Sequence, residues 1–311
     1  MSEAAPPTPA PTPPPRLVLR AGALEAQVLP AAGGALARFD LLAAERRRPL
    51  MRGTDDDAAG PLDCAGFPLV PFCNRIRGGS FGFREETIRL APNMPPDPSP
   101  LHGQGWRLPW DVVSHGPREI ELRLRHAAGE WPWDYEARQV LRLDPGGLAL
   151  TLACTNLSSR PMPCGLGYHP YHPCDGATRL ATTVAGAWTV DAAVLPLTRV
   201  PATGRYDLGD RAICGQDLDN GFDGWGGTAT IRWGGQAPAL RLTSADAGHF
   251  QVYAPASGGL FVAEPVQHAN CALNAPEAQW PGLGMAVLGP GESRSLAARW
   301  DVILPSAVRS A

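Results

Sequence analysis

"IELRLRH" (residues 120–126) alternates apolar and charged side chains without a break. Because successive side chains of a strand point to opposite faces, this alternation predicts a β-strand with one face on a core and the other in water. Turn sequences such as Pro145-Gly146-Gly147 lie between this segment and further alternating segments. Similar alternation occurs in "LALTLACTN" (148–156), "ALRLTS" (239–244), "HFQVYA" (249–254) and "AARWDVIL" (297–304). The pattern predicts an all-β fold, a large antiparallel β-sandwich.

The strand pattern also predicts how the chain is organised. Only "LARFDLLAAERRR" (36–48) allows a helix, and its apolar spacing is ambiguous. No βαβ rhythm, internal repeat or obvious linker is present, so we expect one β-sandwich catalytic domain over residues 16–305. The Pro-rich stretch "PPTPAPTPPP" (6–15) predicts a disordered tail over residues 1–15, and residues 306–311 form a short C-terminal tail.

The composition argues against several classes of function. The chain of 311 residues has a net charge of −3 and no basic run beyond Arg46–Arg48, so we expect no nucleic-acid partner. All 27 basic residues are arginine, which excludes a Schiff-base lysine and a phosphate-loop lysine. No apolar run is long enough for a membrane span, and no signal peptide is evident. The seven cysteines include no C-x-x-C pair, which favours reduced thiols in a cytoplasmic protein.

Two segments carry polar groups that a strand would not need. "PFCNRIRGGSFGF" (71–83) places Asn74 and Arg75 after an apolar run. A guanidinium donates several hydrogen bonds in one plane, which suits neighbouring hydroxyls or a carboxylate; a surface arginine at a strand end is the alternative. "PLHGQGWRLPW" (100–110) places His102 between turn residues. Its Trp106 and Trp110 could form a flat wall for a sugar ring, or equally a pair in the core.

"GLGYHPYH" (165–172) holds two of the seven histidines within four positions. The proline after His169 disfavours a helical backbone, so a helical zinc motif is excluded. A zinc site of His169, His172 and Cys174 is an alternative by ligand type. However, strand geometry puts positions three apart on opposite faces, so we expect no metal.

"FVAEPVQHANCALN" (261–274) places Glu264 directly after an apolar run. Burial would raise the proton affinity of this carboxyl, which suits a general base. A glutamate at a strand end in water is the alternative.

In chain order these segments resemble the aldose 1-epimerase (galactose mutarotase) family, and the resemblance covers nearly the whole chain after the tail. It implies a large antiparallel β-sandwich with a concave sugar-binding face. It also implies interconversion of the α and β anomers of a free aldose. The matching segments are "VLPAAGGALARFD" (28–40), "NRIRGGSF" (74–81), "APN…LHG" (91–103), "GLGYHPYH" (165–172), "LDNGFDGW" (218–225), "EP…ALN" (264–274) and "LGPGES" (288–293).

The resemblance implies a role for each matching residue. Glu264 would be the general base that takes the proton of the anomeric hydroxyl, and His169 the general acid that protonates the ring oxygen. His102 would bond the sugar near the reacting carbon. Other hydroxyls would be held by Arg75 and Asp219, with Asn74 in support. A carboxylate and an imidazole on opposite sides of the ring, the imidazole titrating near ~6.5, need no cofactor, so we expect none.

The chain departs from the family pattern at two places. His172 stands where the family commonly has phenylalanine, and Gln267 and His268 occupy the region where a threonine usually follows the Glu-Pro pair. Neither change touches the expected acid or base, so the reaction type stands while the sugar stays open. We expect a small-molecule monosaccharide as partner and a monomer or homodimer.

Three alternatives stay open at this point. A hexose-6-phosphate 1-epimerase would need further arginines at the far end of the sugar. A non-catalytic carbohydrate-binding protein could share the scaffold. A glycoside hydrolase would need two carboxyls, for which Asp219 and Glu264 could be nominated, but it would leave the histidine motifs unexplained.

Overall fold

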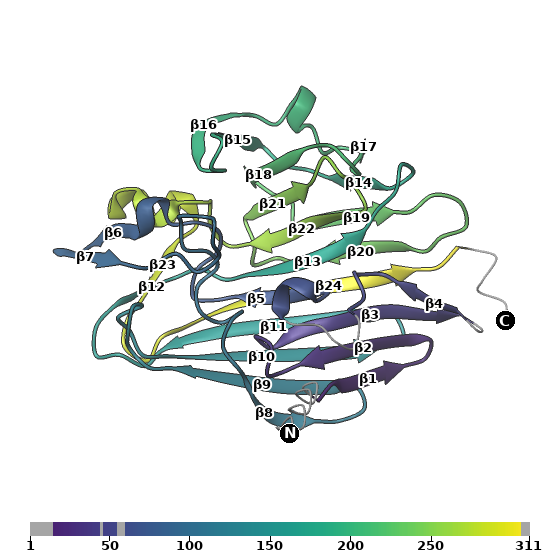
Figure 1. The fold of residues 1–311 in the computed structure, drawn as a ribbon, viewed down its shortest axis with the longest axis horizontal. Coiled ribbons are helices and arrows are strands. Elements are labelled where there is room, and N and C mark those ends of the chain that lie inside the picture. The colour runs from purple at the N-terminus through teal and green to yellow at the C-terminus, as the bar shows by residue number, and fades with distance from the viewer. Residues whose placement is uncertain (1–14, 44–45, 55–59, 306–311) are drawn as a thin grey trace, which may run out of the picture.

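The computed structural model describes residues 15–43, 46–54 and 60–305, and in these residues two large antiparallel sheets pack face to face (Figure 1). The predicted all-β class and the antiparallel β-sandwich are confirmed. The tails predicted at residues 1–15 and 306–311 lie, apart from Pro15, outside the described residues.

The larger sheet carries the N-terminal strands and the strands that follow the middle of the chain. The β5–β13–β22–β21–β18 part of this sheet runs from the middle of Figure 1 to its top. Within the described ranges its order is β1 (Leu17–Ala21), β2 (Leu24–Leu29), β3 (Ala35–Ala43), β5 (Gly66–Leu69), β13 (Gly167–Pro173), β22 (Leu260–Val266), β21 (His249–Ala254), β18 (Leu218–Asp223), β15 (Gly186–Val190) and β16 (Pro196–Pro201), with β4 (Arg46–Pro49) paired to β3.

The second sheet contains most of the strands that the alternating sequences predicted. Over the described part of the chain its order is β17 (Arg211–Ala212), β14 (Arg179–Thr182), β19 (Thr228–Arg232), β20 (Ala239–Thr243), β24 (Ser293–Ile303), β11 (Gly147–Asn156), β10 (Tyr135–Asp144), β9 (Glu119–His126) and β8 (Asp111–His115). Two small hairpins complete the β-structure: β6 (Ser80–Phe83) with β7 (Glu86–Arg89), and β12 (Met162–Cys164) with β23 (Ala286–Leu288).

Strand β9 shows why the alternating sequences fold as they do. Its apolar residues Ile120, Leu122 and Leu124 are buried in the core between the sheets. On the outer face Glu121 pairs with Arg138 of β10 at 2.7 Å. Alternation therefore sends every second side chain inward, and all five alternating segments form strands within a few residues of the predicted limits.

The core between the sheets is rich in aromatic side chains. Tyr168 of β13 packs against Trp300 of β24, with ring centroids 5.5 Å apart, and so joins the two sheets. Both rings are fully buried. Even-numbered positions of β13 therefore face the core, and its odd-numbered positions face the other side of the larger sheet.

The segment 36–48, which allowed a helix, is instead a β-hairpin. Strands β3 and β4 pair antiparallel, with Leu41 opposite Arg48. The helix interpretation was wrong because β3 is buried on both faces: Ala35 and Ala37 belong to one apolar cluster, and Leu36 and Phe39 to the main core. A strand buried on both faces loses the alternation that marks a half-buried one.

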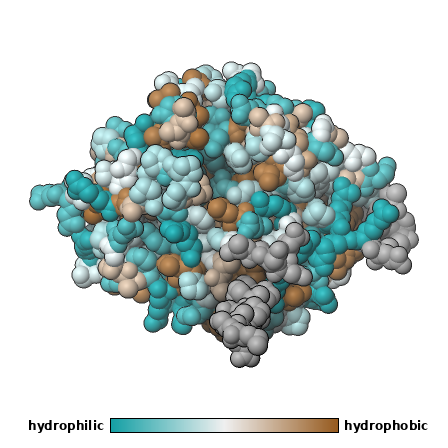
Figure 2. Space-filling model, in the orientation of Figure 1, coloured by the Kyte–Doolittle hydropathy of each residue, from teal (hydrophilic) through white to brown (hydrophobic). Residues whose placement is uncertain are grey.

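Helical structure within residues 15–305, gaps excepted, is limited to 3₁₀ turns: η1 (Pro61–Asp63), η2 (Arg77–Gly79), η3 (Gly204–Tyr206), η4 (Ala272–Asn274), η5 (Glu277–Gln279) and η6 (Pro281–Leu283). None of these described helices has the length and apolar character needed to cross a membrane. All seven cysteines lie in the described ranges, and each is free. On the face of the molecule in Figure 2, hydrophobic residues are scattered among hydrophilic ones.

Candidate active site

A cavity of about 400 Å³ lies on the face of the larger sheet that is turned away from the core. Its walls come from strands β5, β13, β22, β21 and β18 and from two loops beyond β5. All six site residues expected from the sequence line it. Its lining residues are Leu62, Phe67, Asn74, Arg75, Met94, Leu101, His102, His169, Tyr171, Asp219, Gln251, Tyr253 and Glu264.

Strand register brings His169 and Glu264 together. Strands β13 and β22 pair so that Gly167 is opposite Val266 and Tyr171 opposite Val262, which puts His169 opposite Glu264. Nε2 of His169 lies 3.5 Å from Oε1 of Glu264. The two groups therefore stand side by side on neighbouring strands, a closeness that the sequence analysis did not anticipate.

Burial shifts the pKa values of this pair in opposite directions. Desolvation, together with the negative charge of Asp219, raises the pKa of Glu264 well above its ordinary value. Desolvation lowers the pKa of His169 to about 3, and the charge of Arg52 acts in the same direction. The ordinary imidazole value assumed from the sequence does not hold here. Since burial disfavours every charged form, the pair is most stable with Glu264 protonated and His169 neutral.

His102 and Asn74 hold each other in place across two loops. The backbone N–H of Asn74 donates to Nδ1 of His102 at 3.0 Å, and the backbone N–H of His102 donates to the carbonyl of Asn74 at 3.0 Å. Both backbones are left-handed, with φ of 55° and 60°. Because Nδ1 accepts a hydrogen bond, the proton of the neutral His102 ring is on Nε2, which is a donor.

Arg75 and Asp219 are each oriented by a partner that the sequence analysis did not single out. The Nε of Arg75 donates to Asp97 at 2.8 Å. Asp219 accepts a hydrogen bond from Nε2 of Gln251 at 2.8 Å, while burial raises the pKa of its carboxyl. Gln251 is opposite Glu264 in the sheet. The cavity therefore offers both donors and acceptors of hydrogen bonds, as a polyhydroxylated ligand requires.

Four polar side-chain atoms of the lining residues are buried and, within the described residues, have no hydrogen-bond partner. They are Oε2 of Glu264, Nδ1 of His169, Nδ2 of Asn74 and Oε1 of Gln251. Buried polar atoms are normally paired, so unpaired ones in a cavity wall indicate places where a polar ligand would bind.

His172 does not belong to this cavity. Its ring is fully buried on the opposite face of β13, where Nδ1 lies 3.1 Å from the carbonyl oxygen of Leu50 and the ring packs near Phe261. The prediction that His169 and His172 separate to opposite faces is confirmed. Among the described residues no group of three or more His, Cys, Asp or Glu side chains could hold a metal ion.

The aromatic residues that line the cavity are Phe67, Tyr171 and Tyr253, and not the two tryptophans. Phe67 stacks on the ring of His169 at 4.6 Å, with 17° between the planes. Trp106 is buried behind Phe67, at 5.4 Å, and Trp110 lies in the main core. Both indoles donate to backbone carbonyls, so the alternative of core aromatic residues applies to this pair.

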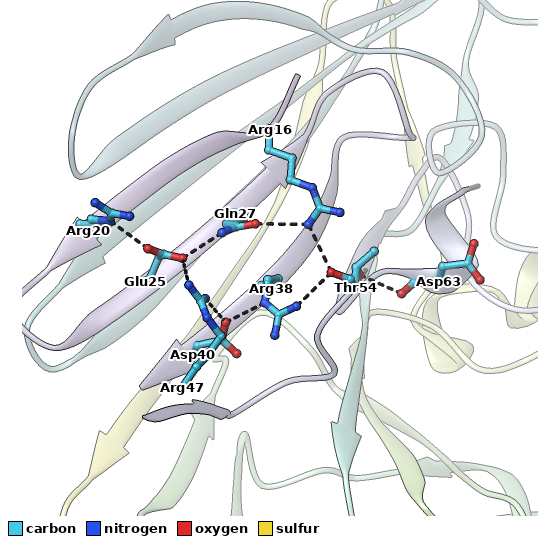
Figure 3. Close-up of polar contacts among 9 residues, drawn as sticks. All are labelled: Arg16, Arg20, Glu25, Gln27, Arg38, Asp40, Arg47, Thr54 and Asp63. Carbon is cyan, nitrogen blue, oxygen red and sulfur yellow. Dashed lines mark hydrogen bonds and ion pairs between the residues drawn. The ribbon is translucent and has the colours of Figure 1, made fainter. Parts of the chain in front are cut away.

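A network of arginine and carboxylate side chains connects the first strands of the chain to Thr54 and Asp63 (Figure 3). Arg38 donates to the carboxylate of Asp40 and to the carbonyl of Thr54, each at 2.9 Å. The hydroxyl of Thr54 donates to the carbonyl of Asp63 at 2.8 Å. Near these anchors Arg52 lies over the ring of Tyr171, 3.9 Å from its centroid. The network therefore reaches Asp63, the neighbour in sequence of the lining residue Leu62.

Sequence reasoning missed several lining residues, for which different signals existed. Tyr171 follows the predicted His169 by two positions in one strand, so alternation could have added it. Gln251 and Tyr253 share one face of a predicted strand, but neither had been singled out as a site residue. Asp97 lies in a Pro-rich loop, "PNMPPDPSP" (92–100), with no periodic signal. Phe67 required knowledge of which strands are neighbours.

Comparisons with known proteins identify the family of this chain. The model of the aldose 1-epimerase family matches residues 15–299. The uncharacterised protein YphB of Escherichia coli K12 is 32% identical over 258 residues, which are 79% of this chain and 86% of that protein.

Solved structures show the same fold. A candidate aldose 1-epimerase of Escherichia coli K12 superposes with a TM-score of 0.86 at 28% identity, covering 94% of this chain and 99% of that one. A galactose mutarotase-like protein of Clostridium acetobutylicum gives a TM-score of 0.81 at 18% identity, covering 93% and 95%. The family match spans nearly the whole chain, and the protein belongs to the aldose 1-epimerase family.

Proposed function

We propose that the protein interconverts the α and β anomers of a free aldose by opening and closing the sugar ring. The observation that carries the proposal is the contact between His169 and Glu264 in the wall of a cavity of sugar-binding character. The family supports the reaction class.

The reaction moves two protons on oxygens that share one carbon. Glu264 takes the proton of the anomeric hydroxyl, while Nε2–H of His169 gives a proton to the ring oxygen. The bond between the anomeric carbon and the ring oxygen breaks, and an open-chain aldehyde forms. Rotation about the next carbon–carbon bond and reversal of both transfers closes the ring on the other face. Two groups 3.5 Å apart suit two oxygens on one carbon better than groups across the ring would.

Burial favours the ring-opening direction of this transfer. With the closed sugar the pair acts as carboxylate and imidazolium, whereas with the open chain both groups are neutral. The pKa of Glu264 is raised and that of His169 lowered, so the buried site favours the neutral pair. One side chain accepts the sugar's proton and the other gives one to the ring oxygen, and the proposal uses no cofactor or metal.

The remaining polar residues hold the sugar's other hydroxyls. Nε2–H of His102 and the guanidinium of Arg75 donate, and the carboxyl of Asp219 accepts. The amide of Asn74 supplies a further donor. These assignments remain proposals supported by the common cavity.

The charge of the cavity favours a free sugar over a sugar phosphate. Arg75 is the one arginine among the described lining residues, and its Nε already pairs with the carboxylate of Asp97 at 2.8 Å. Asp219 and Glu264 line the same space. A phosphate dianion would therefore meet carboxyls without an unpaired cation to balance it, which disfavours binding.

Measurement of mutarotation tests the proposal directly. We expect freshly dissolved glucose or galactose to reach its equilibrium rotation faster with the protein than in buffer, in polarimetry or exchange NMR. Dialysis against a chelator should not change the rate. Acceleration restricted to a 6-phosphate would favour the phosphate alternative. Binding of sugars without acceleration of any common aldose would favour a non-catalytic binding protein.

The pH profile of kcat/KM should reflect the shifted pKa values. The working pair carries one proton in all. It gains a second as pH falls through the pKa of His169, about 3, and loses its own as pH rises through the raised pKa of Glu264. We therefore expect activity to persist well below the ordinary imidazole pKa of ~6.5. Initial rates across pH check this, and an acidic limb at the ordinary imidazole pKa would contradict it.

A further inference from the structure

The loop that carries Asn74 and Arg75 is held by side chains of one distant segment. We call residues 73–77 the arginine loop and residues 268–274 the support segment. Side chains of the support segment accept hydrogen bonds from every second backbone N–H of the arginine loop. These bonds join Cys73 N–H to Nε2 of His268 (2.8 Å), Arg75 N–H to Oδ1 of Asn270 (3.0 Å) and Arg77 N–H to Oδ1 of Asn274 (2.8 Å).

Of the three acceptor side chains, Asn270 is the one that binds the backbone of Arg75, a residue of the cavity wall. Besides its Oδ1 contact, its Nδ2 donates to the carbonyl of Val194 at 3.1 Å, in the turn between β15 and β16. The backbone N–H of Cys271 donates to the carbonyl of Arg75 at 3.2 Å. Both polar groups of the Arg75 backbone are therefore bonded to the support segment, and Asn270 is itself buried.

The hydrogen bond between Asn270 and the backbone of Arg75 helps to position the sugar site. The guanidinium of Arg75 is oriented at Nε by Asp97, but its position in the cavity also depends on where the backbone stands. Asn74 and Arg75 are adjacent, so a shift of this peptide would move both residues of the cavity wall.

His268 acts as a neutral acceptor in the same set. Burial lowers the pKa of this imidazole to about 3, so Nε2 stays free to accept the N–H of Cys73. Its Nδ1 lies 2.8 Å from the carbonyl oxygen of Ala269. Gly165 allows this packing, because a Cβ there would lie 2.3 Å from Cδ2 of His268. Both ring nitrogens are thus used inside the protein, away from the cavity lining.

We propose that Asn270, with His268, is a positioning residue that sets substrate affinity by fixing the arginine loop. This inference rests on the proposed function, in which Arg75 binds the sugar. It assigns the support segment a role in recognition although none of its side chains lines the cavity.

Kinetics of three variants test the role of Asn270. We expect Asn270→Ala to raise KM about 10-fold with kcat changed by less than about 3-fold, since one buried hydrogen bond is lost at a binding loop. Asn270→Asp keeps the acceptor for Arg75 N–H and should restore most of the affinity. Asn156→Ala is the matched control: Asn156 is a buried asparagine with hydrogen bonds of the same kind near Leu288, and its loss should lower Tm without changing KM.

A double-mutant cycle separates positioning from general destabilisation. If Asn270 acts through Arg75, then Asn270→Ala should have little further effect on KM in an Arg75→Ala background. Additive effects of the two substitutions would overturn the inference. An equal rise of KM in Asn156→Ala would overturn it as well.

Hydrogen exchange on the full-length protein gives a readout independent of activity. In Asn270→Ala the amides of the arginine loop should exchange faster than in the wild type, whereas Asn156→Ala should leave them protected. Unchanged exchange in Asn270→Ala would overturn the inference. Absence of mutarotation in the wild-type protein would instead overturn the proposed function, and the exchange result would still stand.

Discussion

Glu264→Gln is expected to lower kcat/KM by about 10²–10⁴-fold, which is the usual contribution of a proton-transfer group. The amide has nearly the shape of the carboxyl but cannot take a proton from the anomeric hydroxyl. Mutarotation rates measured by polarimetry or exchange NMR check the loss. Turnover close to that of the wild type would mean that another group is the base.

The thermal stability of Glu264→Gln should not fall together with its activity. Glu264 is buried, and its raised pKa shows that the site disfavours the carboxylate. A neutral amide avoids the cost of burying that charge, so we expect a Tm at or above the wild-type value. A folded and inactive Glu264→Gln protein would separate a chemical defect from unfolding.

His169→Gln should also lose about 10²–10⁴-fold in kcat. Glutamine can still donate a hydrogen bond to the ring oxygen, but it cannot release the proton that ring opening needs. The substitution thus distinguishes proton transfer from hydrogen bonding alone. Comparison of kcat and KM checks the result, and we expect kcat to carry most of the change.

His172→Phe is the control for this second prediction. It removes the other imidazole of "GLGYHPYH" and its contact with Leu50, on the opposite face of the same strand. We expect nearly full activity, with a stability cost of about 1 kcal/mol for the lost hydrogen bond. If His172→Phe were as inactive as His169→Gln, the assignment of the acid to His169 would be wrong.

The sequence predicted the fold well because alternation is a property of single strands. Ile120, Leu122 and Leu124 are buried as their spacing required. The same rule separated His169 from His172 without knowledge of any neighbour. It gave no clear answer for residues 36–48, because a strand with both faces covered has no alternation to detect.

The candidate site was predicted only in part, for a physical reason. The six predicted residues line one cavity, but the contact between His169 and Glu264 depends on the pairing of strands that lie far apart in the sequence. No local pattern contains that register. Likewise, the sequence marked His268 only as a departure from the family pattern after Glu264, and the structure shows that it accepts a hydrogen bond from the backbone N–H of Cys73.

The proton-transfer pair stands on two adjacent strands, whereas Asn74, Arg75 and His102 stand on loops. The loops can therefore vary in sequence more freely than the two strands can. A one-residue slip between β13 and β22 would move the core-facing side chains of one strand to the other face of the sheet and destroy the core. The position of the proton-transfer pair therefore depends on the folding of the whole sheet. The loops can change length or composition without that penalty. New sugar preferences, whether selected in nature or in the laboratory, should therefore arise by loop exchange on an unaltered pair of strands.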